Sequence, residues 1–140
     1  MKFTLLILTI FLFLGMRNTP IYSVKLKLSN IRNANGRIQL QFYKDEKTFK
    51  AETPYKQIYI PKANVKNHYL EYTIQLEEGV WGLALLDDEN SNGKMDYTIL
   101  PKEGFAFGNY YHTGWSRPKF DDFKLDIHEN TFVTIKFRYV

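Results

Sequence analysis

The sequence contains no cysteine. Its fold therefore has no disulfide bond, and the chain offers no thiol nucleophile and no cysteine-ligated zinc site. The same absence excludes a lipid anchor attached through an N-terminal cysteine. The fold must be held together by its hydrophobic core alone.

The sequence also lacks an apolar run long enough to cross a membrane. Its longest run, Phe3 to Leu14, follows Lys2 and ends before a polar stretch that begins at Arg17. A membrane helix needs ~20 residues, whereas a shorter run after a basic residue is typical of a secretory signal. We predict a signal peptide over residues 1–23, cleaved after Ser23, with a retained short anchor as the alternative.

This prediction gives the protein a compartment and a size. The chain is expected in the periplasm, on the cell surface or in the extracellular medium, with no stable membrane span once the signal is removed. Residues 24–140 suit one domain with a real core. The formal net charge is only +4, and there is no run of five or more Lys or Arg, so nucleic-acid binding is not expected.

Most of the remaining chain alternates between apolar and polar residues, which predicts half-buried strands. Val80 to Leu86 is apolar on both faces and predicts a central strand, whereas Gln57 to Ile60, between two prolines, predicts an edge strand. Asp45 to Lys50 is compatible with one helical turn. The alternating segments are 24–29, 38–43, 70–76, 123–127 and 133–139.

These segments predict an all-β fold with no long helix. We expect an antiparallel β-sandwich of about seven strands, immunoglobulin-like or transthyretin-like, with a closed β-barrel as the alternative. Asn35-Gly36 is a turn signal, so segments 24–29 and 38–43 are expected to form a hairpin.

The strongest chemical signal directly follows the predicted central strand. Oxygen-bearing side chains recur at alternate positions and are followed by Gly93, a spacing typical of loops that wrap Ca²⁺. Lys94 would contribute its backbone carbonyl, and Glu103 would fold back to complete the shell. Because few of these ligands are charged, we expect weak binding, with a dissociation constant of about 10⁻⁴–10⁻³ M or higher. The predicted ligands are Asp88, Asn90, Asn92, Lys94, Asp96 and Glu103.

The same loop has a second interpretation without a metal. Asn92-Gly93 is also a hairpin signal, which would link a strand ending near Asp87 to one beginning near Met95. Asp and Asn side chains can close such a turn by accepting hydrogen bonds from backbone N–H groups.

A segment rich in aromatic residues follows the loop. Its rings would form a stacking platform for a surface glycan, a peptide or an envelope protein, or else would cap one end of the core. The candidate ligand-binding residues are Phe105, Phe107, Tyr110, Tyr111 and Trp115.

The two motifs together resemble a known family. The pattern runs from Gly79-x-Trp81 through Asp88-Glu89-Asn90-x-Asn92-Gly93-Lys94 to Pro101-Lys102-Glu103-Gly104 and Asn109, and continues at Pro118-x-Phe120. It resembles the bacterial exported family known as domain of unknown function 2141 over roughly residues 24–140. Here Trp81 replaces the family's usual Tyr, and Phe105-Ala106-Phe107 replaces Tyr-Gly-Phe. The resemblance implies export and a β-rich fold, and it brings no reaction with it.

Three functions remain open. The first is a non-catalytic exported binding module with a calcium-type loop at residues 88–96. The second is a periplasmic enzyme, or an enzyme accessory domain, that acts on polysaccharide or peptide and joins Asp88, Glu103 and His112 in one cleft. The third is a structural component of an envelope assembly. The acid pairs in the chain are not natural acid/base couples, because neighbouring residues on a strand face opposite sides.

Overall fold

The computed structural model describes residues 18–140. Most of the predicted signal peptide, including the whole apolar run, lies outside these residues. Strand β1 already begins at Ile21, so cleavage after Ser23 would remove the first three residues of this strand. Within residues 18–140, no helix is long and apolar enough to span a membrane.

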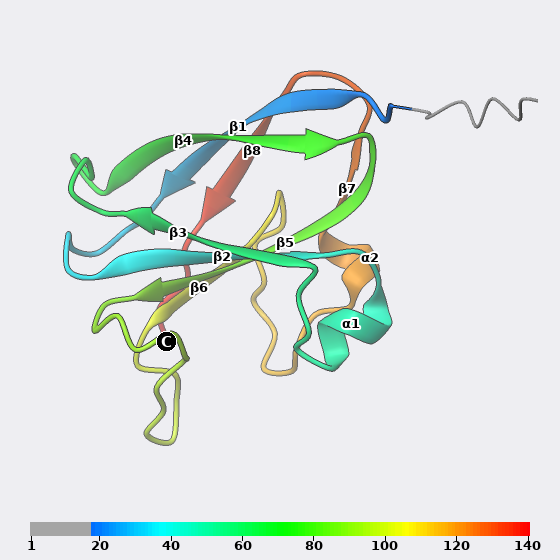
Figure 1. Ribbon diagram of the computed structural model, residues 1–140. Helices are drawn as coiled ribbons and strands as arrows, with labels where there is room; N and C mark the ends of the chain where they lie inside the picture. The colour runs from blue at the N-terminus through cyan, green and yellow to red at the C-terminus, as the bar shows by residue number, and fades with distance from the viewer. Residues whose placement is uncertain (1–17) are drawn as a thin grey trace, which may run out of the picture.

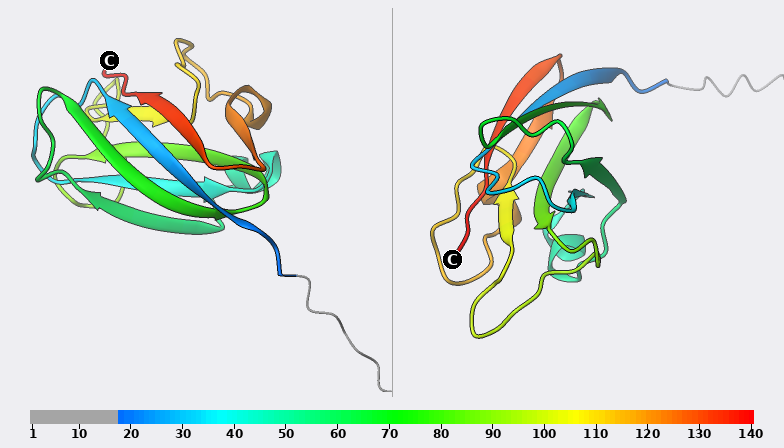
Figure 2. Two further views of the ribbon diagram at one scale, coloured as in Figure 1. Left: turned by 90° about the horizontal axis from the view of Figure 1, so that it is seen from above. Right: turned by 90° about the vertical axis from the view of Figure 1, so that its left-hand side faces the viewer.

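The eight strands form two sheets that pack face to face (Figures 1 and 2). The first sheet has the order β4-β1-β8. The second has the order β3-β2-β5, and the far edge of β5 is shared by β7 along its first half and β6 along its second. The bounds are β1 Ile21–Ser29, β2 Arg37–Tyr43, β3 Lys56–Pro61, β4 Tyr69–Glu77, β5 Gly79–Asp88, β6 Gly104–Phe107, β7 Lys124–Ile127 and β8 Thr131–Lys136.

The predicted β-sandwich is confirmed, and the sheets do not close into a barrel. Strand β5 is central and β3 lies at an edge, as the sequence pattern indicates. Residues 18–140 contain eight strands rather than about seven, since residues 104–107 form β6. The ladders are antiparallel except between β1 and β8, which run parallel.

The main core lies between the sheets and follows the period-two pattern. Val24, Leu26 and Leu28 on β1 have no exposed surface, nor does Leu40 on β2 or Leu83 on β5. Burying each such side chain contributes about 1.5–3 kcal/mol relative to leaving it in water. In the absence of disulfides, this layer is the main source of stability.

A smaller aromatic cluster lies at one end of the second sheet, where two short helices pack. Helix α1 (Glu46–Lys50) is capped by Asp45, whose side chain accepts from the N–H of Thr48, and α2 is Phe120–Phe123. Segment 123–127 therefore begins in a helix rather than a strand. The buried members of the cluster are Tyr43, Phe49, Phe120 and Phe123.

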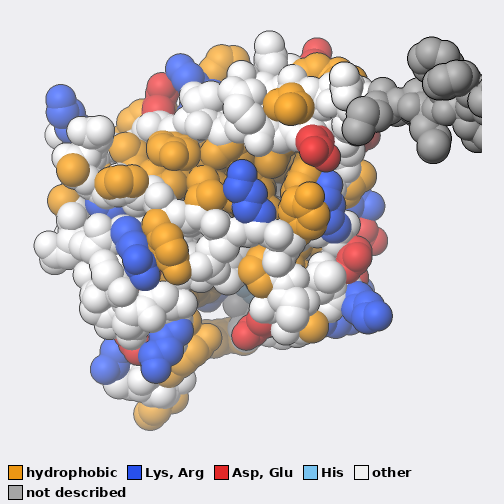
Figure 3. Space-filling model, in the orientation of Figure 1, with side chains coloured by type: hydrophobic (Ala, Val, Ile, Leu, Met, Phe, Trp, Pro, Cys, Tyr) orange, Lys and Arg blue, Asp and Glu red, His pale blue; other side chains and the backbone are white. Residues whose placement is uncertain are grey.

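One side of the sandwich, between the edge strands β3 and β4, leaves apolar side chains visible (Figure 3). Ile58, Val65 and Tyr72 are only partly buried there against the core. Elsewhere on the second sheet, the Nζ atom of Lys44 lies 3.1 Å from the centroid of the Trp81 ring on β5, a cation–π contact.

The predicted hairpin of segments 24–29 and 38–43 is wrong. Strand β1 pairs with β4 and β8, and β2 pairs with β3 and β5, so the two segments lie in opposite sheets. Alternation identifies a half-buried strand but not its partner. The turn at Asn35-Gly36 connects the two sheets instead.

The simple hairpin at Asn92-Gly93 is also wrong, because no strand begins near Met95. Strand β5 does pair antiparallel with the next strand, β6, but residues 89–103 intervene. We call residues 89–103 the site loop. It projects from the sandwich at the end of the central strand (Figure 1).

Candidate functional site

The site begins at two adjacent acids at the end of β5. Asp87 lies opposite Ile38 in the β2 ladder and Asp88 lies opposite Arg37. Because side chains alternate along a strand, Asp87 points into the sandwich and Asp88 points to its outer face. Neither residue has any exposed surface, so each carboxylate needs protein partners.

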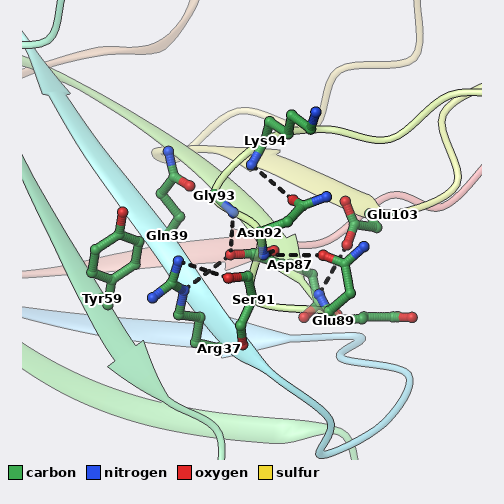
Figure 4. A network of polar contacts seen from close by, with 12 residues as sticks. Arg37, Gln39, Tyr59, Asp87, Glu89, Ser91, Asn92, Gly93, Lys94 and Glu103 are labelled. Atoms are coloured by element: carbon green, nitrogen blue, oxygen red, sulfur yellow. Dashed lines mark hydrogen bonds and ion pairs between the residues drawn. The ribbon is translucent and has the colours of Figure 1, made fainter.

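Asp88 closes the start of the site loop. One carboxylate oxygen accepts from the N–H of Asn92 at 2.9 Å, and the other accepts from the N–H of Gly93 at 3.0 Å. The Nε atom of Arg37 donates to the latter oxygen at 3.0 Å, and its Nη2 atom donates to the carbonyl of Ser91 at 3.2 Å (Figure 4). This carboxylate therefore fixes the turn to the sheet.

Asp96 closes the second half of the turn. Its Oδ2 atom accepts from the side-chain amide of Asn90 at 2.6 Å and from that of Asn92 at 2.9 Å. The amide oxygens of these asparagines accept in turn from the N–H groups of Asn92 and Lys94, at 3.1 and 3.0 Å. Lys94 thus contributes backbone, not side chain, to these interactions.

Glu103 folds back beneath the loop, where only 4% of its surface is exposed. Its carboxylate accepts from the N–H of Glu89 at 3.0 Å and from that of Asp96 at 3.3 Å (Figure 4). Burial raises the pKa of the Glu103 carboxyl, and the negative charges of Asp96 and Asp88 raise it further, against the lowering effect of the two N–H donors.

The structure thus brings the six predicted metal-ligand positions into one turn and joins them by hydrogen bonds. Asp88 and Glu103 are engaged by backbone N–H groups, and Asp96 by two amides. Within residues 18–140, no three Asp, Glu or His side chains are grouped closely enough to hold a metal by themselves. A cation there would depend on amide and carbonyl oxygens as well.

Two backbone features shape this turn. Gly36 has a φ of +68°, and a Cβ atom there would lie 2.1 Å from the carbonyl oxygen of Asp88. Gly93 has a φ of +79°, with its nearest neighbour, Arg37, at 3.7 Å from such a Cβ. The turn that connects β1 to β2 therefore packs closely against the start of the site loop at Gly36. The sequence does not reveal this contact.

On the inner face, Asp87 belongs to a different cluster. Its carboxylate accepts from the Nζ atom of Lys62 at 2.5 Å and from the hydroxyl of Tyr139 at 2.6 Å. Lys62 is 1% exposed and also donates to Asn33 at 3.2 Å. Burial raises the pKa of Asp87, opposed by these two donors, and burial also raises the pKa of Tyr139. No sequence pattern singled out this cluster.

A groove lies beside the site loop. It consists of a pocket of about 420 Å³ and a second of about 310 Å³ that share lining residues. The space-filling view shows the molecule hollowed between the projecting loop and α1 (Figure 3). We call the two pockets together the groove; their shared residues are Met95, Tyr97, Phe105, Phe107 and Arg117.

The five predicted ligand-binding aromatics fall into two groups. Phe105, Phe107 and Trp115 line the groove, and Trp115 is 83% exposed. Tyr110 packs instead on the aromatic cluster, and the ring of Tyr111 lies near Lys136 on β8. Phe107 lines the groove and also packs on the aromatic cluster, since its ring centroid lies 5.0 Å from that of Phe123.

Several groove residues were not singled out in the sequence. Gln39 and Gln41 come from β2, and Arg138 follows β8. His112, which the sequence suggested only for the enzyme alternative, also lines the groove, and its Nε2 atom lies 2.5 Å from the carbonyl oxygen of Ser116. Only the packing of distant segments places these residues together.

A search of curated proteins and a search of solved structures each found no match to this chain. The family model described as an uncharacterised protein conserved in bacteria, DUF2141, matches residues 26–135. This match covers both sheets, the site loop and the aromatic segment, and it confirms the resemblance drawn from the sequence. The chain therefore belongs to the bacterial family DUF2141.

Proposed function

We propose that this protein is an exported, non-catalytic binding module whose ligand occupies the groove. We further propose that residues 88–96, with Glu103, form a weak Ca²⁺ site that orders one wall of the groove. The observation that carries this proposal is the run of exposed apolar side chains around the larger pocket.

These side chains are an unusual surface for a small soluble domain. Ile99 is 98% exposed, Trp115 83% and Tyr97 64%, and all three line the same pocket. Exposed apolar residues scattered singly need no explanation, but grouped ones mark interaction sites. The volume of the larger pocket, about 420 Å³, lies within the range of small-ligand sites.

The groove favours binding over catalysis. The enzyme alternative requires Asp88, Glu103 and His112 to meet in one cleft. Asp88 and Glu103 do not line the groove, and backbone N–H groups occupy both carboxylates. The acid that does line it, Glu52, is paired with Arg117. Among residues 18–140, no acidic side chain that lines the groove is therefore free to act as a general base there.

The Ca²⁺ part of the proposal rests on the position of Asp96. This residue gathers the side chains of Asn90 and Asn92, and it stands between Met95 and Tyr97, which both line the groove. A cation bound among these oxygens would replace the amide donors on Asp96 and hold the groove wall in place. Such a site is expected to bind at 10⁻⁴–10⁻³ M or more weakly.

A thermal melt tests the Ca²⁺ site. Calcium at millimolar concentration should raise the melting temperature relative to EDTA, in a saturating manner, because it binds only the folded loop. Magnesium should do less. Asp96→Ala should abolish the rise, whereas Asp121→Ala, at an exposed acid on α2, should keep it. If the melting temperature does not change at any calcium concentration, this part of the proposal is wrong.

A fluorescent dye tests the groove itself. The apolar probe 8-anilinonaphthalene-1-sulfonate should bind the native protein, and Trp115→Ser should greatly reduce the signal. Phe132 is a matched control, since it is 64% exposed but lies on β8 in the other sheet. If Phe132→Ser lowers the signal as much as Trp115→Ser does, the groove is not the binding site.

A further inference from the structure

Two buried side-chain atoms within residues 18–140 have no hydrogen-bond partner. They are the Oε1 atom of Gln39 and the Nδ1 atom of His112. Gln39 lines the smaller pocket of the groove and His112 lines the larger one. Buried polar atoms are nearly always paired, so two unpaired atoms in one groove point to a ligand that pairs them.

The unpaired atom of Gln39 is an acceptor. Its Nε2 atom donates to the Oε1 atom of Gln57 at 2.9 Å, and Gln41 donates to the same oxygen at 3.0 Å. Tyr43 donates in turn to the Oε1 atom of Gln41 at 2.9 Å. Gln39 is only 4% exposed, and its free oxygen faces Gly93, where a Cβ atom would lie 4.0 Å away (Figure 4).

The unpaired atom of His112 is an acceptor as well. Its Nε2 atom lies 2.5 Å from the carbonyl oxygen of Ser116. A carbonyl only accepts, so Nε2 carries a proton, and in the Nε2–H tautomer Nδ1 has a lone pair that accepts. The groove therefore presents two buried acceptors that require donors.

Both arginines that line the groove already donate to groups of the protein. Arg138 donates to the carbonyls of His112 and Gly114, at 3.0 and 2.8 Å. Arg117 is paired with Glu52 and donates to the carbonyl of Phe49 at 3.3 Å. A ligand that donates hydrogen bonds therefore matches the groove best, and each hydroxyl of a hydroxyl-rich molecule is such a donor.

We propose that the groove binds a glycan. Sugar hydroxyls donate to Gln39 Oε1 and His112 Nδ1, and the apolar faces of the sugar rings pack against the exposed rings of Trp115 and Tyr97. Because the two pockets adjoin through five shared lining residues and each contributes one acceptor, the ligand spans more than one sugar. This inference rests on the groove being the binding site, and it names the chemical class of the ligand.

Titration with neutral hexasaccharides tests the inference. Cellohexaose, xylohexaose, mannohexaose and chitohexaose are added separately to the purified protein, with hexaglycine as the peptide comparison. Trp115 reports binding by fluorescence, since the other tryptophan, Trp81, is 3% exposed. At least one hexasaccharide should bind, and hexaglycine should not. Binding of hexaglycine alone, or of no hexasaccharide, overturns the inference.

Two variants locate the contact. Gln39→Leu and His112→Phe each remove one acceptor and should weaken binding of the hexasaccharide about tenfold, the usual effect of one buried hydrogen bond. Gln75→Leu, on β4, is the matched control and should bind like the wild type. Wild-type affinity in both groove variants would also overturn the inference.

The dye experiment separates the two proposals. If the dye binds in a Trp115-dependent manner but no hexasaccharide does, the groove remains the binding site and the glycan is wrong. If neither binds, both proposals fail. Circular dichroism melts of the variants confirm that any loss of binding does not come from unfolding.

Discussion

Asp87 and Asp88 are neighbours in the chain, yet they organise two different parts of the molecule. Asp87 lies inside the sandwich, bonded to the side chains of Lys62 and Tyr139. Asp88 lies on the outer face, bonded mainly to backbone N–H groups of the site loop. A shift of one position along β5 thus decides whether a carboxylate belongs to the interior of the sandwich or closes the site loop.

The two clusters should also differ in what they stabilise. A buried ion pair adds little net stability over an apolar pair, but it becomes very costly when one partner is lost. A carboxylate that closes a turn acts on the turn itself. Breaking the inner cluster should therefore unfold the whole domain more readily, whereas breaking the outer cluster should loosen the loop.

Lys62→Met should have the largest effect. It leaves Asp87 charged and buried with only Tyr139 as a donor, and it should lower the free energy of unfolding by about 3–5 kcal/mol in urea titration. The double variant Lys62→Met/Asp87→Leu should recover most of this loss, because neither charge remains. If Lys62→Met is as stable as the wild type, leaving Asp87 without its lysine partner costs no stability and the prediction is wrong.

Gly36→Ala should be the next most damaging change. The new Cβ atom would lie 2.1 Å from the Asp88 carbonyl oxygen, in addition to the cost of positive φ. Gly93→Ala is the matched control, since its φ is similar but its nearest neighbour lies at 3.7 Å. Gly93→Ala should cost about 1–2 kcal/mol and Gly36→Ala clearly more. If the two variants lose the same free energy of unfolding, the backbone near Asp88 can move away from the new Cβ atom without cost.

Asp88→Ala should act locally. It removes the acceptor for two N–H groups and a partner of Arg37, and should cost about 1–3 kcal/mol. Asp88→Asn keeps one oxygen and should cost less. Amide hydrogen exchange at Asn92 and Gly93 should accelerate more than exchange in the β1–β4 ladder. Uniform acceleration throughout the domain would erase the proposed difference between the two clusters.

The smallest effect is expected at Glu46, a solvent-accessible carboxylate that, like Asp88, accepts a hydrogen bond from a backbone N–H group. The N–H of Phe120 donates to it at 2.5 Å, and Lys50 pairs with it, so its pKa is lowered. Its contribution is present above the ordinary Glu pKa of about 4.5 and is lost as the pH falls through the lower folded-state value. Glu46→Gln should flatten this slight acid dependence in melts between pH 2 and 7, and an unchanged slope would contradict it.

Most of the strands and the location of the loop chemistry could be predicted from the sequence, although β6, α2 and the lack of a strand near Met95 could not. Alternation in β1 and β4, the apolar run of β5 and the prolines around β3 each depend on which side chains face water, a local property that spacing records. The Asp88–Asp96 turn was recognisable for the same reason, because its hydrogen bonds join residues within a few positions of one another. The family resemblance rested on these local features too.

Only the tertiary structure decided which strands pair and what the two acids contact. The pairing of β1 with β4 and β8, the meeting of Asp87 with Lys62 and Tyr139, and the placing of Gln39 and His112 in one groove all join residues far apart in the chain. No local pattern encodes such contacts, because they follow from the lowest free energy of packing the two sheets as a whole.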